Sequence, residues 1–212
     1  MGLLNEADWQ GQWIGLDRPA PGDSETQWSR LAARYLRKEF ALTKEVKRAT
    51  VHIAGMGLYE LFINGQRIGE QVLAPAPTDY RKTILYNTYD VTPQLQKENA
   101  IGVILGNGRF YTMRQNYKPY KIPTFGYPKL RLNLIVEYTD GSRQTIASDI
   151  SWKLTTEGPI RSNNEYDGEE YDARKELGDW NRTGYDDTNW IPAGRVSIPS
   201  GTSVSYTHLT LP

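Results

Sequence analysis

An Asn-Gly pair between two runs of alternating residues restricts the fold of this chain more than any other feature. Apolar residues dominate 58–63, Asn64-Gly65 follows, and a more polar run returns over 66–69. Both residues of a two-residue hairpin turn need positive φ, which Asn and Gly tolerate best. The pattern predicts an antiparallel β-hairpin and therefore a protein that contains β-sheet.

Other short segments also alternate in the manner of strands. Leucine or valine occupies every second position of 130–136, and Asp140-Gly141 predicts another tight turn. The best helix candidate is 29–37, with which a strand beginning near Tyr35 competes. The other predicted strands are 9–16, 36–42, 50–54, 58–63, 100–105, 145–147 and 151–154. Many short strands separated by turns predict an all-β chain, an antiparallel β-sandwich of jelly-roll or galactose-binding-like type.

Composition excludes several classes of function. With 25 basic and 25 acidic side chains in 212 residues, the chain has the balanced surface charge that nucleic-acid binders lack. It has no cysteine, which excludes disulfides and thiolate chemistry, and no apolar run near the ~20 residues of a membrane span. Residues 1–5 are too short for a signal peptide, which leaves a cytoplasmic and a secreted location both open.

The last residues have a pattern of their own. The sequence of 204–212 can be written in the codons of a transposon-type sequencing adapter. We therefore expect a domain over 1–202 and an adapter-derived tail over 203–212, with His208 carrying no function. The alternative is a genuine strand that leads into a further domain.

Motifs spread through the chain carry a family resemblance. They are 36–40, 64–65, 72–75, 78–80, 89–92, 99–103, 105–111, 158–160, 166–174 and 185–190. In this order and spacing, over about residues 8–200, they resemble the N-terminal β-sandwich of bacterial α-L-rhamnosidases of glycoside hydrolase family 78.

The resemblance implies a role beside a catalytic domain. Such enzymes remove terminal α-L-rhamnose with inversion, using two carboxyl groups in a C-terminal helical barrel. No segment here matches that barrel, so we expect no catalytic residue and no activity from this chain alone. The expected partners are an L-rhamnose-containing carbohydrate and the barrel of the same polypeptide, with no nucleic acid and no membrane.

An acidic cluster offers three interpretations. Its members are Asp167, Glu169, Glu170 and Asp172. In an extended strand, alternate members share a face and could form a glycosidase pair or an oxygen-rich Ca²⁺ site. Arg174 favours a third interpretation, in which ion pairs fix a loop. We predict that Asp167 and Glu169 bind ligand.

The loop that follows 100–105 is the other predicted sugar site. It contributes Asn107, Arg109, Tyr111, Asn116 and Tyr117, which combine polar groups for hydroxyls with rings for C–H faces. Because some similar sandwiches bind rhamnose with calcium, Ca²⁺ is the one cofactor that the resemblance suggests. The alternative is a surface loop whose tyrosines pack on the sheet.

Three further residues complete the predicted set. Asp79 suits an Asx turn and also a ligand contact, and Tyr80 beside it is a candidate binding residue. His52 has no partner at catalytic spacing. Rival functions are a free-standing carbohydrate-binding module, a sandwich of another glycosidase, and a scaffold without ligand.

Overall fold

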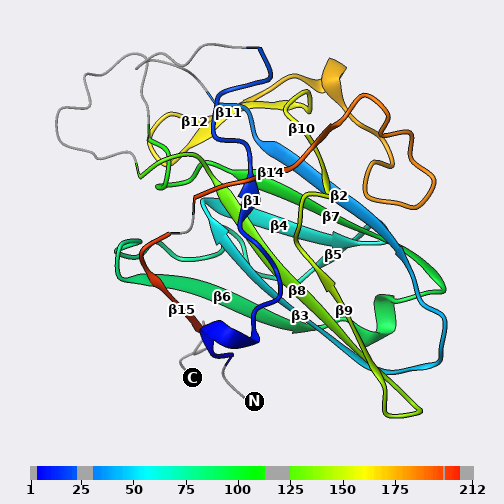
Figure 1. Cartoon of the computed structure of the whole chain (residues 1–212). Helices are drawn as coiled ribbons and strands as arrows, with labels where there is room; N and C mark the ends of the chain where they lie inside the picture. The colour runs from blue at the N-terminus through cyan, green and yellow to red at the C-terminus, as the bar shows by residue number, and fades with distance from the viewer. Residues whose placement is uncertain (1–3, 23–30, 113–124, 198, 206–212) are drawn as a thin grey trace.

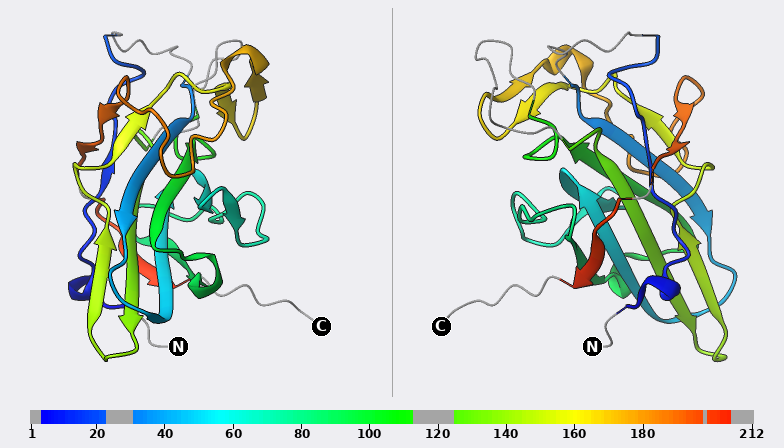
Figure 2. Two further views of the ribbon diagram at one scale, coloured as in Figure 1. Left: turned by 90° about the vertical axis from the view of Figure 1, so that its right-hand side faces the viewer. Right: turned by 60° about the vertical axis from the view of Figure 1, so that its left-hand side comes forward.

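Two β-sheets face each other across one apolar core (Figures 1 and 2). This computed structural model describes residues 4–22, 31–112, 125–197 and 199–205. Its only helical turns within those residues are three short 3₁₀ segments, Glu6–Asp8 (η1), Thr92–Gln94 (η2) and Ala173–Lys175 (η3), and no helix there could cross a membrane. The predicted all-β antiparallel sandwich is confirmed.

The larger sheet has seven strands in the order β14-β1-β8-β3-β6-β15, with β9 also pairing with β8. Its strands are β1 (Ile14–Gly15), β3 (Val46–Met56), β6 (Thr83–Asp90), β8 (Lys129–Tyr138), β9 (Arg143–Ala147), β14 (Gly194–Arg195) and β15 (Thr202–Ser205). All of its described pairings are antiparallel except that of β15 with β6.

The second sheet has six strands in the order β13-β10-β2-β7-β4-β5. Its strands are β2 (Arg34–Ala41), β4 (Leu58–Ile63), β5 (Gln66–Ile68), β7 (Glu98–Gly106), β10 (Lys153–Thr155) and β13 (Ile191–Pro192). The strands β11 (Ile160–Asn164) and β12 (Gly168–Tyr171) pair with each other as a separate two-stranded ribbon at one end of the sandwich (Figure 1).

The predicted Asn-Gly hairpin is confirmed as the β4–β5 turn. Asn64 has a φ of 51° and Gly65 a φ of 81°. Asn64 Nδ2 also donates to Gln94 O and Asn99 Oδ1, each at 2.9 Å. The turn residue thus fixes the hairpin to the neighbouring loop as well as reversing the chain.

Period-2 alternation produces the core. Ile101, Val103 and Leu105 of β7 are fully buried and pack with the alternate leucines of β8 in one cluster. Each such side chain contributes about 1.5–3 kcal/mol when it leaves water. The intervening residue Ile104 lies on the opposite face of its sheet, with Tyr35 and Trp180.

A buried arginine fixes a long loop to that outer face. Arg37 on β2 is 2% exposed and donates to the carbonyls of Trp180 and Arg182, each at 2.9 Å. It also forms ion pairs with Glu39 and Asp187. These contacts hold a segment without long strands against the second sheet.

One local prediction was wrong, and one open alternative is decided. The predicted strand 9–16 is a strand only at Ile14–Gly15. Gly11 N donates to Asn133 Oδ1 at 2.7 Å, and a Cβ on Gly11 would collide with Leu132 O, so this segment packs along β8 without forming a full ladder. Of the two interpretations of 29–37, the strand beginning near Tyr35 is confirmed, because β2 begins at Arg34; residues 29 and 30 lie outside the described part.

The predicted boundary between 202 and 203 falls inside β15. Thr202–Ser205 pairs in parallel with β6, and 206–212 lie outside the described residues. The adapter origin of the tail stays a prediction, as does the jelly-roll subtype. His52 agrees with a structural role, since its Nδ1 lies 2.9 Å from Thr88 Oγ1 and burial lowers its pKa.

Candidate functional site

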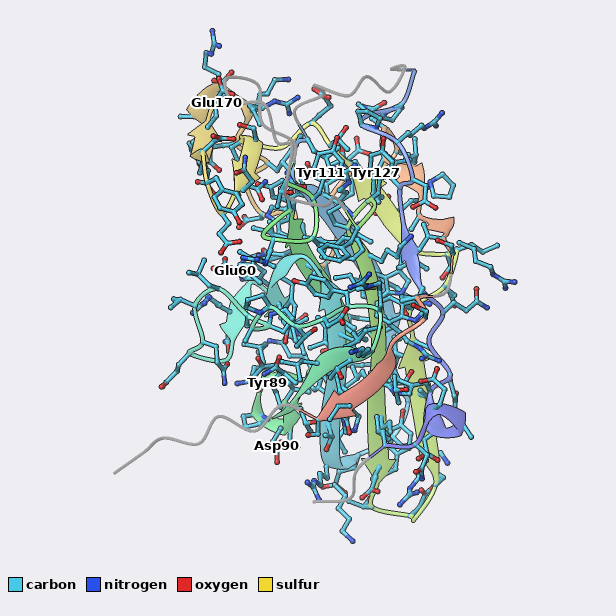
Figure 3. The ribbon with its side chains drawn as sticks, turned by 90° about the vertical axis from the view of Figure 1, so that its left-hand side faces the viewer. Glu60, Tyr89, Asp90, Tyr111, Tyr127 and Glu170 are labelled. Carbon is cyan, nitrogen blue, oxygen red and sulfur yellow. The ribbon has the colours of Figure 1, made fainter. Side chains whose placement is uncertain are left out.

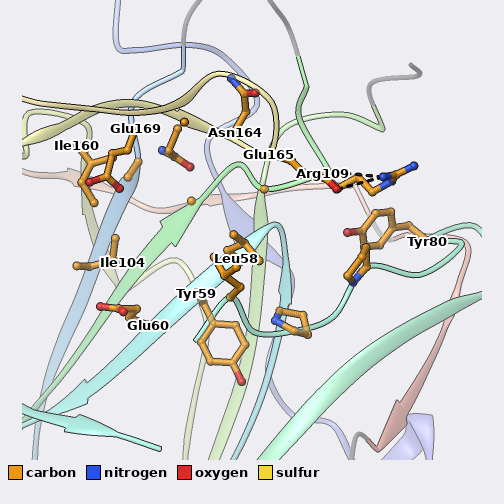
Figure 4. Close-up of a pocket in the computed structure, with 18 residues that line it drawn as sticks. Leu58, Tyr59, Glu60, Tyr80, Ile104, Arg109, Ile160, Asn164, Glu165 and Glu169 are labelled. Carbon is orange, nitrogen blue, oxygen red and sulfur yellow. Dashed lines mark hydrogen bonds and ion pairs between the residues drawn. The ribbon is translucent and has the colours of Figure 1, made fainter. Parts of the chain in front are cut away.

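A cleft of about 660 Å³ opens where the second sheet meets the β11–β12 ribbon (Figure 4). Its walls come from the start of β4, the end of β7, the loop over 73–80 and the ribbon. Side chains far apart in the sequence therefore meet here, which is the usual arrangement of a small-molecule site.

The floor of the cleft is apolar. Leu58, Ile104 and Ile160 lie in it, and Pro75 and Pro77 form part of the wall. Ile104 faces the cleft because its neighbours on β7 occupy the core. Such a floor suits the C–H face or methyl group of a ligand better than its polar groups.

Charged side chains surround this floor. Arg109 Nη1 lies 3.2 Å from Glu165 Oε2, and Figure 4 shows the pair beside Tyr80. Glu60 Oε1 lies 3.5 Å from Arg67 Nε. Glu169 of β12 has no ion pair among the residues that the structure describes. The rim thus offers several acceptors and one guanidinium that is already paired.

Tyr80 separates this cleft from a second hollow. Tyr80 is 6% exposed, and its ring meets those of Phe110 and Phe125 edge to face, with centroids 5.1 and 5.2 Å away. Burial raises the pKa of its hydroxyl, which therefore stays neutral. The residue lines both spaces and fixes the wall between them.

The second hollow has about half the volume, about 350 Å³. Lys129 Nζ lies there, 3.3 Å from Asp17 Oδ1 and 3.0 Å from Ser197 Oγ. Because these contacts join the N-terminal segment, β8 and the C-terminal segment, Lys129 serves as a structural tie.

Of the predicted site residues, Tyr80, Arg109 and Glu169 line the cleft together. Asn107 is buried behind it, where its Nδ2 donates to Leu31 O at 2.7 Å and its backbone N donates to Asn163 Oδ1 at 2.6 Å. Tyr111 is 3% exposed and stacks on Tyr127, with ring centroids 5.5 Å apart (Figure 3). Asn116 and Tyr117 lie outside the described residues.

Asp79 forms a turn rather than part of the cleft wall. Its Oδ1 accepts from the backbone N of Arg81 at 3.3 Å, and the Arg81 side chain lowers its pKa by hydrogen bonding. The residue therefore positions Tyr80, which follows it directly.

The acidic cluster does not share one extended face. Asp167 lies in the turn before β12, where its Oδ2 accepts from Asn164 Nδ2 at 3.1 Å. Asp172 caps η3, and its carboxylate is bound by Arg174 with both contacts at 2.8 Å. No group of three metal-ligating side chains that could hold an ion is found among the described residues, and calcium stays a prediction.

Leu58, Glu60 and Ile160 also line the cleft, and the sequence predictions had missed them. For Glu60 the signal was present, since it interrupts an otherwise apolar strand. The other two are ordinary strand residues whose exposure depends on where the ribbon lies, which no local pattern indicates.

Comparison with known proteins places the chain in a family. A family model described as the α-L-rhamnosidase N-terminal domain matches residues 44–210. The chain belongs to this family. An α-L-rhamnosidase of Formosa agariphila is 42% identical over 209 residues, which span 90% of the chain and 22% of the relative.

Solved structures agree with this assignment. The α-L-rhamnosidase from Dictyoglumus thermophilum superposes with a TM-score of 0.83 at 42% identity, over 98% of this chain and 23% of that one. The Streptomyces avermitilis α-L-rhamnosidase complexed with L-rhamnose superposes with a TM-score of 0.73 at 37% identity, over 82% of this chain and 17% of that one. The rhamnosidase-type sandwich thus spans about a fifth of the length of the curated relatives it matches.

Proposed function

We propose that this chain is the non-catalytic accessory sandwich of an α-L-rhamnosidase and that its cleft binds a terminal sugar such as L-rhamnose. The parent protein would hydrolyse terminal α-L-rhamnose with carboxyl groups of a separate catalytic region. The share of the relatives' length that the chain covers supports this division of labour.

The cleft is the observation that carries the binding proposal. It combines an apolar floor at Leu58 and Ile104 with hydrogen-bonding groups on Arg109, Glu60 and Glu169. Sugar recognition needs both surfaces, because one face of the ring is apolar while the hydroxyls need partners.

Calorimetric titration of the full chain with L-rhamnose, with and without Ca²⁺, tests the proposal. We expect saturable one-to-one binding that Arg109→Ala weakens at least tenfold. Arg143→Ala is the matched control, because Arg143 forms a comparable exposed pair with Glu137 at 2.7 Å on strands away from the cleft. Equal loss in both variants would show that the sugar does not bind at the cleft, and no binding by a folded sample would leave a scaffold without ligand.

Hydrolysis is tested separately. We expect no release of nitrophenol from an aryl α-L-rhamnoside by this chain, while binding persists. Turnover that survives repurification would contradict the assignment of catalysis to another region.

A further inference from the structure

Carboxylates outnumber cations among the described side chains that line the cleft. Glu60, Glu165 and Glu169 line it, against the single guanidinium of Arg109. Arg109 is already committed, since its Nη1 lies 3.3 and 3.2 Å from the two oxygens of Glu165. The described lining residues include no second cation, and Glu60 is paired only with Arg67, which lies outside the lining.

Glu60 and Glu169 face the same apolar surface from opposite sides. Figure 4 shows them above and below Ile104, one from β4 and the other from the ribbon. Arg67, which lies near Glu60, is itself held by Gln71 O at 2.6 Å and Gly69 O at 3.3 Å. These neutral carbonyls leave the charge of the guanidinium intact, but its 3.5 Å pair with Glu60 is exposed to solvent, so Arg67 offsets Glu60 only in part.

Carboxylates in this arrangement discriminate between ligands. An ionised carboxylate accepts hydrogen bonds and cannot donate them, so it binds hydroxyl groups and repels anions. One unpaired and one partly balanced carboxylate within about 8 Å of an added negative charge weaken its binding about tenfold at low salt, and screening reduces this effect.

We infer that the cleft selects neutral, hydroxyl-bearing sugars and rejects sugars that carry a carboxylate or sulfate, with Glu60 and Glu169 as the specificity-determining residues. This inference rests on the proposed function and deepens it. The apolar floor acts in the same direction, because it leaves an anionic substituent without a counter-ion.

Three sugars of one ring configuration test the inference. They differ only at C6, which is a methyl group in L-rhamnose, a hydroxymethyl group in L-mannose and a carboxylate in L-mannuronate. We expect L-mannuronate to bind about tenfold more weakly than L-mannose at low salt. In the double variant E60Q/E169Q, and in the wild type at high salt, the difference should fall below about threefold.

The matched control is E98Q/E137Q, which removes the same charge away from the cleft. Glu98 is the first residue of β7, whereas the cleft lies at the other end of that strand, and Glu137 lies near the end of β8. This control should keep the tenfold difference. Equal binding of the neutral and anionic sugars by the wild type, or a difference that both double variants retain, would overturn the inference alone. Absence of binding for all three sugars would overturn the proposed function and the inference with it.

Discussion

The sandwich and the β11–β12 ribbon differ in how they are stabilised. Core residues of the sandwich such as Ile53 and Leu132 are 0% exposed, whereas every residue of β12 is exposed. The ribbon's strands pair with each other, and their register shifts between Ile160 and Ser162. Burial therefore stabilises the support, while the ribbon carries Glu169 to the cleft with little burial of its own.

Hydrogen bonds from β11 anchor the ribbon to the sandwich. Ala33 N donates to Ile160 O at 3.1 Å, while the bond from Asp172 N to Pro159 O at 2.8 Å joins the residues that flank the two ribbon strands. Asn163 Oδ1 accepts from the backbone of Asn107. Because Ile160 lies at the base of the ribbon and Asn163 next to its turn, the sandwich holds β11 near both of its ends.

The largest effect on the free energy of unfolding is expected from a substitution in the sandwich core. Ile53→Ala removes a fully buried side chain and should lower the free energy of unfolding by about 3–4 kcal/mol. Ile150→Ala makes the same chemical change at a residue that is 61% exposed, and should cost less than about 0.5 kcal/mol. Urea denaturation followed by tryptophan fluorescence measures both.

Ile53→Val keeps the test informative if the alanine variant does not fold, with an expected cost of about 1 kcal/mol. Equal losses at the two isoleucines would show that burial does not distinguish these regions.

A second, smaller effect concerns two arginines. Arg37→Met leaves Asp187 and two carbonyl groups without their donor and should lower the free energy of unfolding by about 2–3 kcal/mol. Arg174, whose side chain is 89% exposed, forms its ion pair in water beside the ribbon. Arg174→Met should therefore leave the urea midpoint unchanged, and a comparable drop in both variants would contradict the distinction.

The same contrast explains what the sequence could predict. The hairpin at Asn64-Gly65 and the strand at 130–136 were predictable because turn chemistry and alternation are local properties. The strand at 9–16 was not, because Trp9 and Trp13 pack in a cluster formed by distant segments. Alternation there reflects burial without strand pairing.

The candidate site was predictable only in part, for a related reason. Tyr80, Arg109 and Glu169 were found from residue type, and the structure brings them to one cleft. Asn107 has the same polar character but lies buried as a support, and Glu60 reaches the cleft through the position of the ribbon. Residue chemistry indicates candidates, while tertiary contacts decide which of them face a ligand.

The smallest effect lies in the ribbon and its cap. Hydrogen bonds from Arg174 lower the pKa of Asp172 from 3.8 to about 2. Because the folded-state pKa is depressed, this cap contributes stability above pH 3.8 and loses it as the pH falls through 2. NMR titration of the carboxyl group should give a midpoint near 2, which Arg174→Met raises toward 3.8.

A midpoint that Arg174→Met leaves unchanged would mean that the arginine does not hold the cap. The loss should remain local, because the ribbon contributes no buried side chain from β12 to the sandwich core.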